Sequence, residues 1–154
     1  MTDFNPKEYK VMALRDCPVP DSLRMCETPD HAADYWRLHI ASHSYFDTER
    51  ECFVVLLLNV RKRVKGHQLV TIGLMDTLLV HPREVFRAAI VSCAAAIVLM
   101  HNHPSGDPTP SEADIKVTRD LIRAGQLLKL EVIDHVIMGN PNHSSLRKLG
   151  CFYS

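Results

Sequence analysis

The sequence predicts an α/β protein with a single domain built around a mixed sheet. Its 154 residues are a typical length for one domain. Residues 52–58, 95–100 and 132–138 form almost continuously apolar runs, which is typical of strands buried on both faces. Helical patterns follow Pro82 and Ser111, between these runs. Strands that alternate with helices in this way indicate the α/β class.

The first 28 residues form an N-terminal arm, and we expect the domain to span residues 29–154. The arm contains three prolines and scattered charges, so the sequence leaves open whether it is loose or packed as an irregular segment. The domain then begins with a helix, because Thr28 can cap its N-terminus and Pro29 suits its first turn. The positions expected to be buried in this helix are Ala32, Ala33, Trp36, Leu38 and Ile40.

A hairpin is predicted after the first helix. The apolar strand at residues 52–58 leads into a charged turn at residues 60–66, and a second strand follows over residues 68–72. Two such strands separated by a short turn should pair antiparallel. The helix opened by Pro82 then continues to about residue 90.

The last predicted helix starts at Ser111 and runs to about residue 128. Its apolar residues recur near the helical period, which defines the face expected to be buried. These residues are Ile115, Leu121, Ile122 and Leu128, widened by Ala113, Val117 and Ala124. The strand at residues 132–138 follows, and the remaining residues are predicted to form a short tail.

The composition indicates a globular protein, and we expect a cytoplasmic one, because the N-terminus shows no signal-peptide pattern and the cysteines fit a reducing compartment. Hydrophobic residues make up 46% of the chain and charged residues 23%, which argues against disorder. Eighteen basic and eighteen acidic residues cancel, so the charge gives no support for binding nucleic acid or an anionic membrane. The apolar run at residues 88–100 is too short to cross a bilayer, and we expect no membrane association. Five cysteines without CxxC spacing predict free thiols, with Cys52 and Cys93 buried.

Three side chains beyond the strand at residues 95–100 could carry chemistry. His101 and His103 are two residues apart in an extended segment, so both imidazoles should point to the same side, and Pro104 keeps His103 extended. Asp114 lies in the first turn of the next helix, which a loop rich in Gly and Pro can bring back toward the histidines. Two imidazoles and one carboxylate suit Zn²⁺ and leave a fourth position open for water.

The same residues also allow an interpretation without a metal. Ser111 and Asp114 nearly form a capping box, with Asp at the position where Glu or Gln is preferred. A His-x-His pair also occurs by chance. Taken singly, these signals leave metal binding and helix capping open, whereas the complete string at residues 101–114 favours a metal site.

That string, His-Asn-His-Pro-Ser-Gly-Asp-Pro-Thr-Pro-Ser-Glu-Ala-Asp, resembles a metalloprotease signature. His-x-His, seven residues, Ser, two residues and Asp is the pattern of the JAMM (MPN-plus) superfamily. The extended form is similar to bacterial RadC and its stand-alone relatives. Further similar stretches lie at residues 80–86, 134–139 and 145–147, so the resemblance covers residues 45–150.

The resemblance implies a JAMM/MPN-like fold, an α/β/α layered mixed sheet similar in architecture to cytidine deaminases. It also implies a zinc metallopeptidase that cleaves an amide or isopeptide bond in a peptide or protein substrate. His101, His103 and Asp114 would hold the Zn²⁺.

The JAMM mechanism implied by the resemblance adds two catalytic residues. A glutamate before an early core strand takes a proton from the zinc-bound water and passes it to the leaving amine. Glu51 fits that position, and Glu49 is the alternative. Ser111 would donate a hydrogen bond to the oxyanion that forms.

Other functions stay open. The RadC name carries a DNA-repair label, so a DNA-linked accessory role is one alternative, supported only by the small basic turn at residues 60–66. The arm shows no helix-hairpin-helix pattern like that of longer family members. A catalytically silent interaction domain becomes preferable if Glu49 and Glu51 both lie far from the histidines. A zinc deaminase is set aside, because its His-x-Glu and Pro-Cys-x-x-Cys signatures are missing.

The remaining polar residues are predicted to have structural roles. We favour an ordinary half-buried position for His135, with a contact to the metal ligands as the alternative. Asp107 is expected to serve a turn together with Gly106 and Pro108. The other histidines are expected at the surface or in capping roles, namely His31, His39, His43, His67, His81 and His143.

Overall fold

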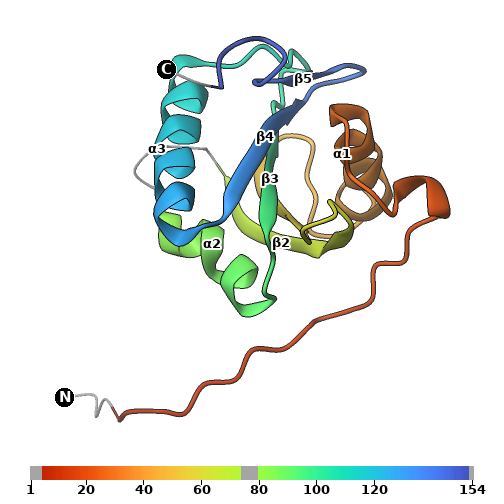
Figure 1. The fold of residues 1–154 in the computed structure, drawn as a ribbon. Helices are drawn as coiled ribbons and strands as arrows, with labels where there is room; N and C mark the ends of the chain where they lie inside the picture. Colours follow the sequence, from red (N-terminus) through yellow and green to blue (C-terminus); the bar gives the residue numbers. More distant parts are fainter. Residues whose placement is uncertain (1–4, 74–79, 153–154) are drawn as a thin grey trace.

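The computed structural model of the chain describes residues 5–73 and 80–152. Within these ranges, five strands form one mixed sheet in the order β2-β1-β3-β4-β5 (Figure 1). Only β3 and β4 are parallel, and the other neighbouring pairs are antiparallel. The strands are β1 (Glu51–Leu58), β2 (Val64–Gly73), β3 (Ala96–Asn102), β4 (Glu131–Met138) and β5 (His143–Ser145).

Helices cover both faces of the sheet, as the α/β/α prediction requires (Figure 1). On one face, α1 (Pro29–Tyr35) continues into a π-helical turn, η2 (Trp36–Ile40). On the other face lie α2 (Pro82–Val91) and α3 (Glu112–Leu128). A short 3-10 turn, η1 (Asp21–Leu23), precedes α1.

The two halves of the core come from the alternation of side chains along the central strands. In β1, Phe53 and Val55 belong to the cluster under α2 and α3, whereas Val54 and Leu56 belong to the cluster under α1. Every residue from Cys52 to Leu58 is buried. Burial on both faces explains why this strand is continuously apolar in sequence.

Three strand predictions need correction. Strand β2 begins four residues earlier than expected, because the turn before it is tight: the Asn59 N–H donates to the Arg63 carbonyl, and Lys62 adopts a left-handed conformation at φ 61°. Strand β3 runs on through His101 and Asn102, so the first histidine is part of the sheet. The predicted tail contains a further strand, β5.

Some expected core positions are exposed. Leu38 is exposed because it lies two residues beyond the buried Trp36 and therefore on the opposite side of the helical turn. Ala113 and Leu128 are exposed in α3, whose buried stripe instead passes through Asp114 and Thr118. The buried residues of α3 are Asp114, Val117, Thr118, Leu121 and Gly125.

Cysteine and histidine positions also differ in part from expectation. Cys52 is a buried free thiol as predicted, but Cys93 is exposed, because it lies in the turn after α2 with φ 55°. His39 was expected at the surface and is buried, and its Nε2 donates to the Pro18 carbonyl over 2.7 Å. His67 is half-buried beside Tyr35.

The N-terminal arm contains both of the structures that the sequence left open. Residues 5–14 are exposed and run away from the domain in an extended conformation (Figure 1). From Arg15 onward the arm contacts η2, since the Arg15 guanidinium donates to the His39 carbonyl over 3.1 Å. The arm has no helix or strand before residue 21 in the described range. The boundary at residue 28 stays a prediction.

Membrane-spanning helices were not expected. Within the described part of the chain, no helix combines the length and the apolar character needed to cross a bilayer.

Candidate metal centre

The end of β3 places two histidines on the face of the sheet that α3 covers. Ile97 and Leu99 of β3 belong to the core under α3, so alternation along the strand directs His101 to the same side. His101 is fully buried. His103 follows directly after the strand, and its N–H donates to the Met138 carbonyl of β4 over 2.9 Å, which keeps the chain extended there.

The first turn of α3 brings Asp114 to the histidines. The Ser111 hydroxyl accepts from the Asp114 N–H at 3.1 Å, and the Asp114 carboxylate accepts from the Ser111 N–H at 2.9 Å, which together form a complete capping box. The Asp114 carboxylate also faces both histidines. Helix capping and contact with the histidines are therefore compatible, and the two interpretations of the sequence do not compete.

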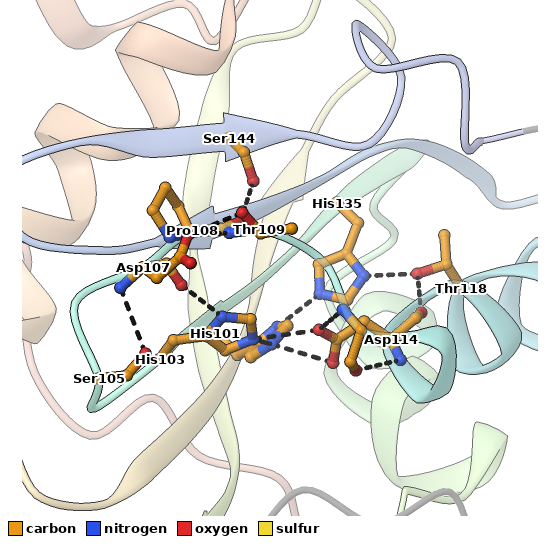
Figure 2. A network of polar contacts seen from close by, with 11 residues as sticks. His101, His103, Ser105, Asp107, Pro108, Thr109, Asp114, Thr118, His135 and Ser144 are labelled. Atoms are coloured by element: carbon orange, nitrogen blue, oxygen red, sulfur yellow. Dashed lines mark hydrogen bonds and ion pairs between the residues drawn. The ribbon is translucent and has the colours of Figure 1, made fainter.

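The ligand atoms of His101, His103 and Asp114 converge on one point (Figure 2). Nε2 of His101 lies 3.1 Å from Nε2 of His103 and 3.2 Å from Oδ1 of Asp114, and Nε2 of His103 lies 3.1 Å from Oδ2 of Asp114. Four ligands placed tetrahedrally at ~2.0–2.1 Å from Zn²⁺ are about 3.3 Å apart. The spacing and the chemistry of the three donors therefore fit a zinc ion.

The hydrogen bonds among these three side chains also determine the charge of Asp114 and of His103. Burial favours a higher pKa for Asp114, but its hydrogen bonds to His101 and His103 outweigh burial and hold that pKa well below its usual value. The hydrogen bond to Asp114 raises the pKa of His103, against the opposing effect of burial. A carboxylate that stays ionised beside two imidazoles attracts a cation, which can be a proton or a metal ion.

The loop after β3 orients the ring of His103. Nδ1 of His103 lies 2.8 Å from the main-chain carbonyl oxygen of Asp107, which can only accept, so Nδ1 carries a proton. In a neutral ring, Nε2 then presents its lone pair to the centre. The Asp107 side chain accepts from Thr109, which agrees with the predicted turn, but the contact to His103 through its main chain was not predicted.

Two glycines allow that loop to pack against the chain after β4. Gly106 adopts φ 86°, a conformation that favours glycine. A Cβ added to Gly139 would collide with the Gly106 carbonyl oxygen and would lie 2.8 Å from the Asn142 oxygen. The close approach of these segments therefore depends on Gly139.

His135 is the main site residue that our sequence interpretation placed wrongly. It is fully buried, not half-buried, and its Nε2 lies 2.7 Å from Nδ1 of His101 (Figure 2). Its Nδ1 lies 2.5 Å from the hydroxyl of Thr118, and burial holds the pKa of His135 well below 6.5. Strand register gives the signal that could have located it, since His135 pairs with Leu99, two residues before His101.

Glu51 lies on the face of the sheet that carries His101. Phe53 pairs with His101, and Glu51 is two residues earlier in β1, so its side chain emerges on the same face. Its negative charge contributes to the raised pKa of His103. Glu51 is half-buried, whereas Glu49 is exposed in the turn before β1. The arrangement favours Glu51 over Glu49 as the carboxylate that faces the centre.

Asn102, between the two histidines, is a residue to which the sequence gave no role. Its side-chain carbonyl accepts from the Cys52 N–H at 2.8 Å, and its amide nitrogen donates to the Arg50 carbonyl at 2.9 Å. Both contacts are to the backbone on either side of Glu51. The side chain of Asn102 therefore fixes the position of Glu51 relative to β3.

Ser111 is exposed at the rim of the centre. Its hydroxyl oxygen accepts from the Asp114 N–H, so its own proton can be donated to another group. The same side chain can thus cap α3 and serve as a hydrogen-bond donor.

Comparison with known proteins places the chain in a family. The family model for the RadC-like JAB domain matches residues 26–151. A UPF0758 protein of Desulforamulus reducens is 46% identical over 104 residues, which are 68% of this chain and 46% of the relative. A UPF0758 protein of Trichodesmium erythraeum is 41% identical over 130 residues, which are 84% of this chain and 51% of the relative. The chain thus spans about half the length of these relatives. The protein belongs to the RadC-like JAB domain family.

Proposed function

We propose that this domain is a zinc-dependent metallopeptidase that hydrolyses an amide or isopeptide bond in a protein substrate. The observation that carries the proposal is the convergence of His101, His103 and Asp114 within hydrogen-bond distance of one another, with Glu51 on the same face. The relatives' names state no activity, so support for the chemistry comes from the site and from the resemblance of residues 101–114 to the JAMM signature.

The three convergent side chains would hold the ion through Nε2 of both imidazoles and a carboxylate oxygen of Asp114. A divalent cation at this point would lower the pKa of a water in its open position toward ~7 and would polarise the carbonyl of the scissile bond. Three protein ligands, rather than four, are typical of catalytic zinc sites.

Glu51 would act as the general base and then as the general acid. Its carboxylate would accept a proton from the attacking water and deliver that proton to the nitrogen of the leaving amine. A positioned proton-transfer group typically contributes a factor of about 10²–10⁴ to the rate. The partial exposure of Glu51 suits this role, because the carboxylate must reach both the centre and the substrate.

Ser111 would stabilise the oxyanion. Its hydroxyl proton is available for donation, and the capping bond from the Asp114 N–H fixes the position of its oxygen. A donor that is already oriented toward developing charge is effective because it needs no reorganisation during the reaction.

The alternative functions receive less support from the site. An interaction domain without catalysis would be favoured if both glutamates lay far from the histidines, but Glu51 acts electrostatically on His103. The basic turn that could meet nucleic acid follows Leu58, whereas the centre lies at the opposite end of β1. A DNA-linked role would therefore involve a surface separate from this centre.

Two measurements test the proposal. Zinc content, measured by mass spectrometry, should be near one ion per chain in the wild type and strongly reduced in His103→Ala. Cleavage of a panel of isopeptide-linked substrates should fall by about 10²–10⁴ in Glu51→Gln, with zinc content unchanged. Glu49→Gln is the matched control and should cleave like the wild type. Equal cleavage by the wild type and Glu51→Gln would remove Glu51 as the base.

A further inference from the structure

A chain of hydrogen bonds connects β3, β4 and α3 behind the metal centre (Figure 2). It runs from His101 Nδ1 to His135 Nε2 over 2.7 Å and from His135 Nδ1 to the Thr118 hydroxyl over 2.5 Å. The Thr118 hydroxyl then donates to the main-chain carbonyl of Asp114 over 2.7 Å. His101, His135 and Thr118 are each 0% exposed, so bulk water does not compete for these bonds.

The direction of each bond follows from the end of this chain. A carbonyl oxygen can only accept, so the single hydroxyl proton of Thr118 is donated to the Asp114 carbonyl. The Thr118 oxygen must then accept from His135. Nδ1 of His135 therefore carries a proton. The ring nitrogens of His135 bond to Thr118 and His101, both without charge in this arrangement, and a buried charged ring without an anionic partner is costly. In the neutral ring Nε2 accepts, so His101 Nδ1 donates.

We infer that His135 and Thr118 are positioning residues that fix the tautomer of His101, with the proton on Nδ1 and the lone pair of Nε2 directed at the metal centre. The inference rests on the proposed metal site, and it extends that site by two residues. In a histidine that binds a metal through one ring nitrogen, the N–H of the other ring nitrogen usually donates a hydrogen bond to a carboxylate, a carbonyl or water. Here the acceptor is a neutral imidazole, which adds no further negative charge to a centre that already contains Asp114.

The network also connects two ligands to each other. Asp114 contacts His101 directly through its carboxylate, and it is the acceptor at the far end of the chain through its carbonyl. Rotation of the His101 ring would therefore break its contacts both to the Asp114 carboxylate and to His135. His103 reaches the same tautomer by a separate contact, to the Asp107 carbonyl, so the two rings can be tested independently.

A pair of threonine variants tests the inference. Thr118→Val keeps the shape of the side chain but removes the hydroxyl. His135 can then carry its proton on Nε2, where it no longer accepts from the Nδ1–H of His101. We expect the zinc affinity, measured by competition with a chelator, to fall by about 10–100-fold in Thr118→Val. Thr118→Ser retains the hydroxyl and should bind zinc like the wild type. Thr71→Val, in β2, is the control for loss of a threonine hydroxyl away from the network.

A second measurement needs neither zinc nor hydrolysis. Long-range ¹H–¹⁵N NMR of the metal-free protein at about pH 9, where histidine is ordinarily neutral, reports which ring nitrogen carries the proton. We expect Nδ1 to carry a proton in both His101 and His135 of the wild type, and a shift of His135 toward Nε2–H in Thr118→Val. A His101 ring without a proton on Nδ1 in the wild type overturns the inference, even if Thr118→Val does not fold. Wild-type zinc affinity in folded Thr118→Val also overturns it.

The two experiments separate this inference from the proposed function. Loss of the proposed function, shown by zinc binding without any cleavage in the wild type, leaves the tautomer measurement interpretable. The expected tautomers with normal zinc affinity in Thr118→Val would show that the contacts exist but do not tune the site, which contradicts the inference.

Discussion

The side-chain amide of Asn102 brackets Glu51, with one hydrogen bond to the backbone before it and one to the backbone after it. Asn102 lies between His101 and His103, so its side chain, together with the pairing of β1 and β3, sets the distance between Glu51 and the candidate metal centre. This contact links the proposed base to the proposed metal site, which lie about 50 residues apart in the sequence.

Asn102→Asp should impair catalysis without weakening metal binding. A carboxylate can still accept from the Cys52 N–H but cannot donate to the Arg50 carbonyl, and it would face that oxygen with like charge. A misplaced catalytic group can cost ~10²-fold in rate, so we expect a fall of that order in kcat for the cleaved substrate. Zinc affinity should stay near the wild-type value, since no ligand changes.

Asn59→Asp is a suitable control for this variant. Asn59 accepts from the N–H groups of Arg61 and Arg63 at the opposite end of β1, and a carboxylate can accept the same bonds. Its kcat should equal that of the wild type. A parallel loss of zinc affinity and kcat in Asn102→Asp would contradict a role confined to Glu51.

Zinc binding should weaken as the pH falls. The hydrogen bond to Asp114 raises the pKa of His103, so the metal-free protein keeps a proton on His103 to a higher pH than a free imidazole would. Zinc must displace this proton, and its affinity should therefore decline as the pH drops below the raised pKa of His103. Chelator competition at several pH values measures this, and His143→Ala, outside the centre, should follow the wild-type curve.

The stability of the metal-free protein should show the opposite trend. A group whose pKa is raised on folding stabilises the fold below its unfolded pKa, near 6.5, and this contribution is lost as the pH rises through the folded pKa. The Tm of the metal-free wild type should thus lose, as the pH rises above about 6.5, a contribution that His103→Ala lacks. An identical pH dependence of Tm in both proteins would show that His103 and Asp114 do not share a proton.

Gly139→Ala should disturb the centre from outside it. The new Cβ would collide with the Gly106 carbonyl oxygen, and the loop that carries Asp107 would have to move. Overpacking of this kind typically costs about 1–3 kcal/mol, which thermal unfolding can measure. Because Asp107 orients the ring of His103, zinc affinity should fall as well. An unchanged Tm would mean that the loop accommodates a methyl group without shifting.

The fold and the convergence of His101, His103 and Asp114 could be predicted from the sequence because their signals are local. Continuous apolar runs mark β1 and β3, and the pattern at Ser111 and Asp114 marks the start of α3. The capping box and the proposed metal contact use the same carboxylate, so either interpretation of the pattern placed Asp114 at the correct position.

The residues behind the ligands could not be predicted in the same way. Thr118 and His135 lie on buried faces, but hydrophobic periodicity assigns such faces to apolar residues and gives polar ones no weight. Their partners are also distant in sequence, since His135 in β4 contacts His101 in the neighbouring strand β3. For Asn102, the contact to β1 depends on the register of two strands, which no local pattern contains.

Ser111 is the residue in which capping and catalysis can be separated by substitution. Replacing an N-cap serine with glycine costs only a few tenths of a kcal/mol, whereas alanine costs about 0.5–2 kcal/mol. Ser111→Gly should therefore keep the Tm near that of the wild type while removing the hydroxyl that would donate to the oxyanion. Loss of one such donor reduces kcat by about 10²–10³, so we expect a fall of that size in cleavage with zinc content unchanged. Ser111→Thr retains both the cap and the donor and should restore most of the activity. If Ser111→Gly cleaves like the wild type, Ser111 serves only to start α3, and another group must stabilise the oxyanion.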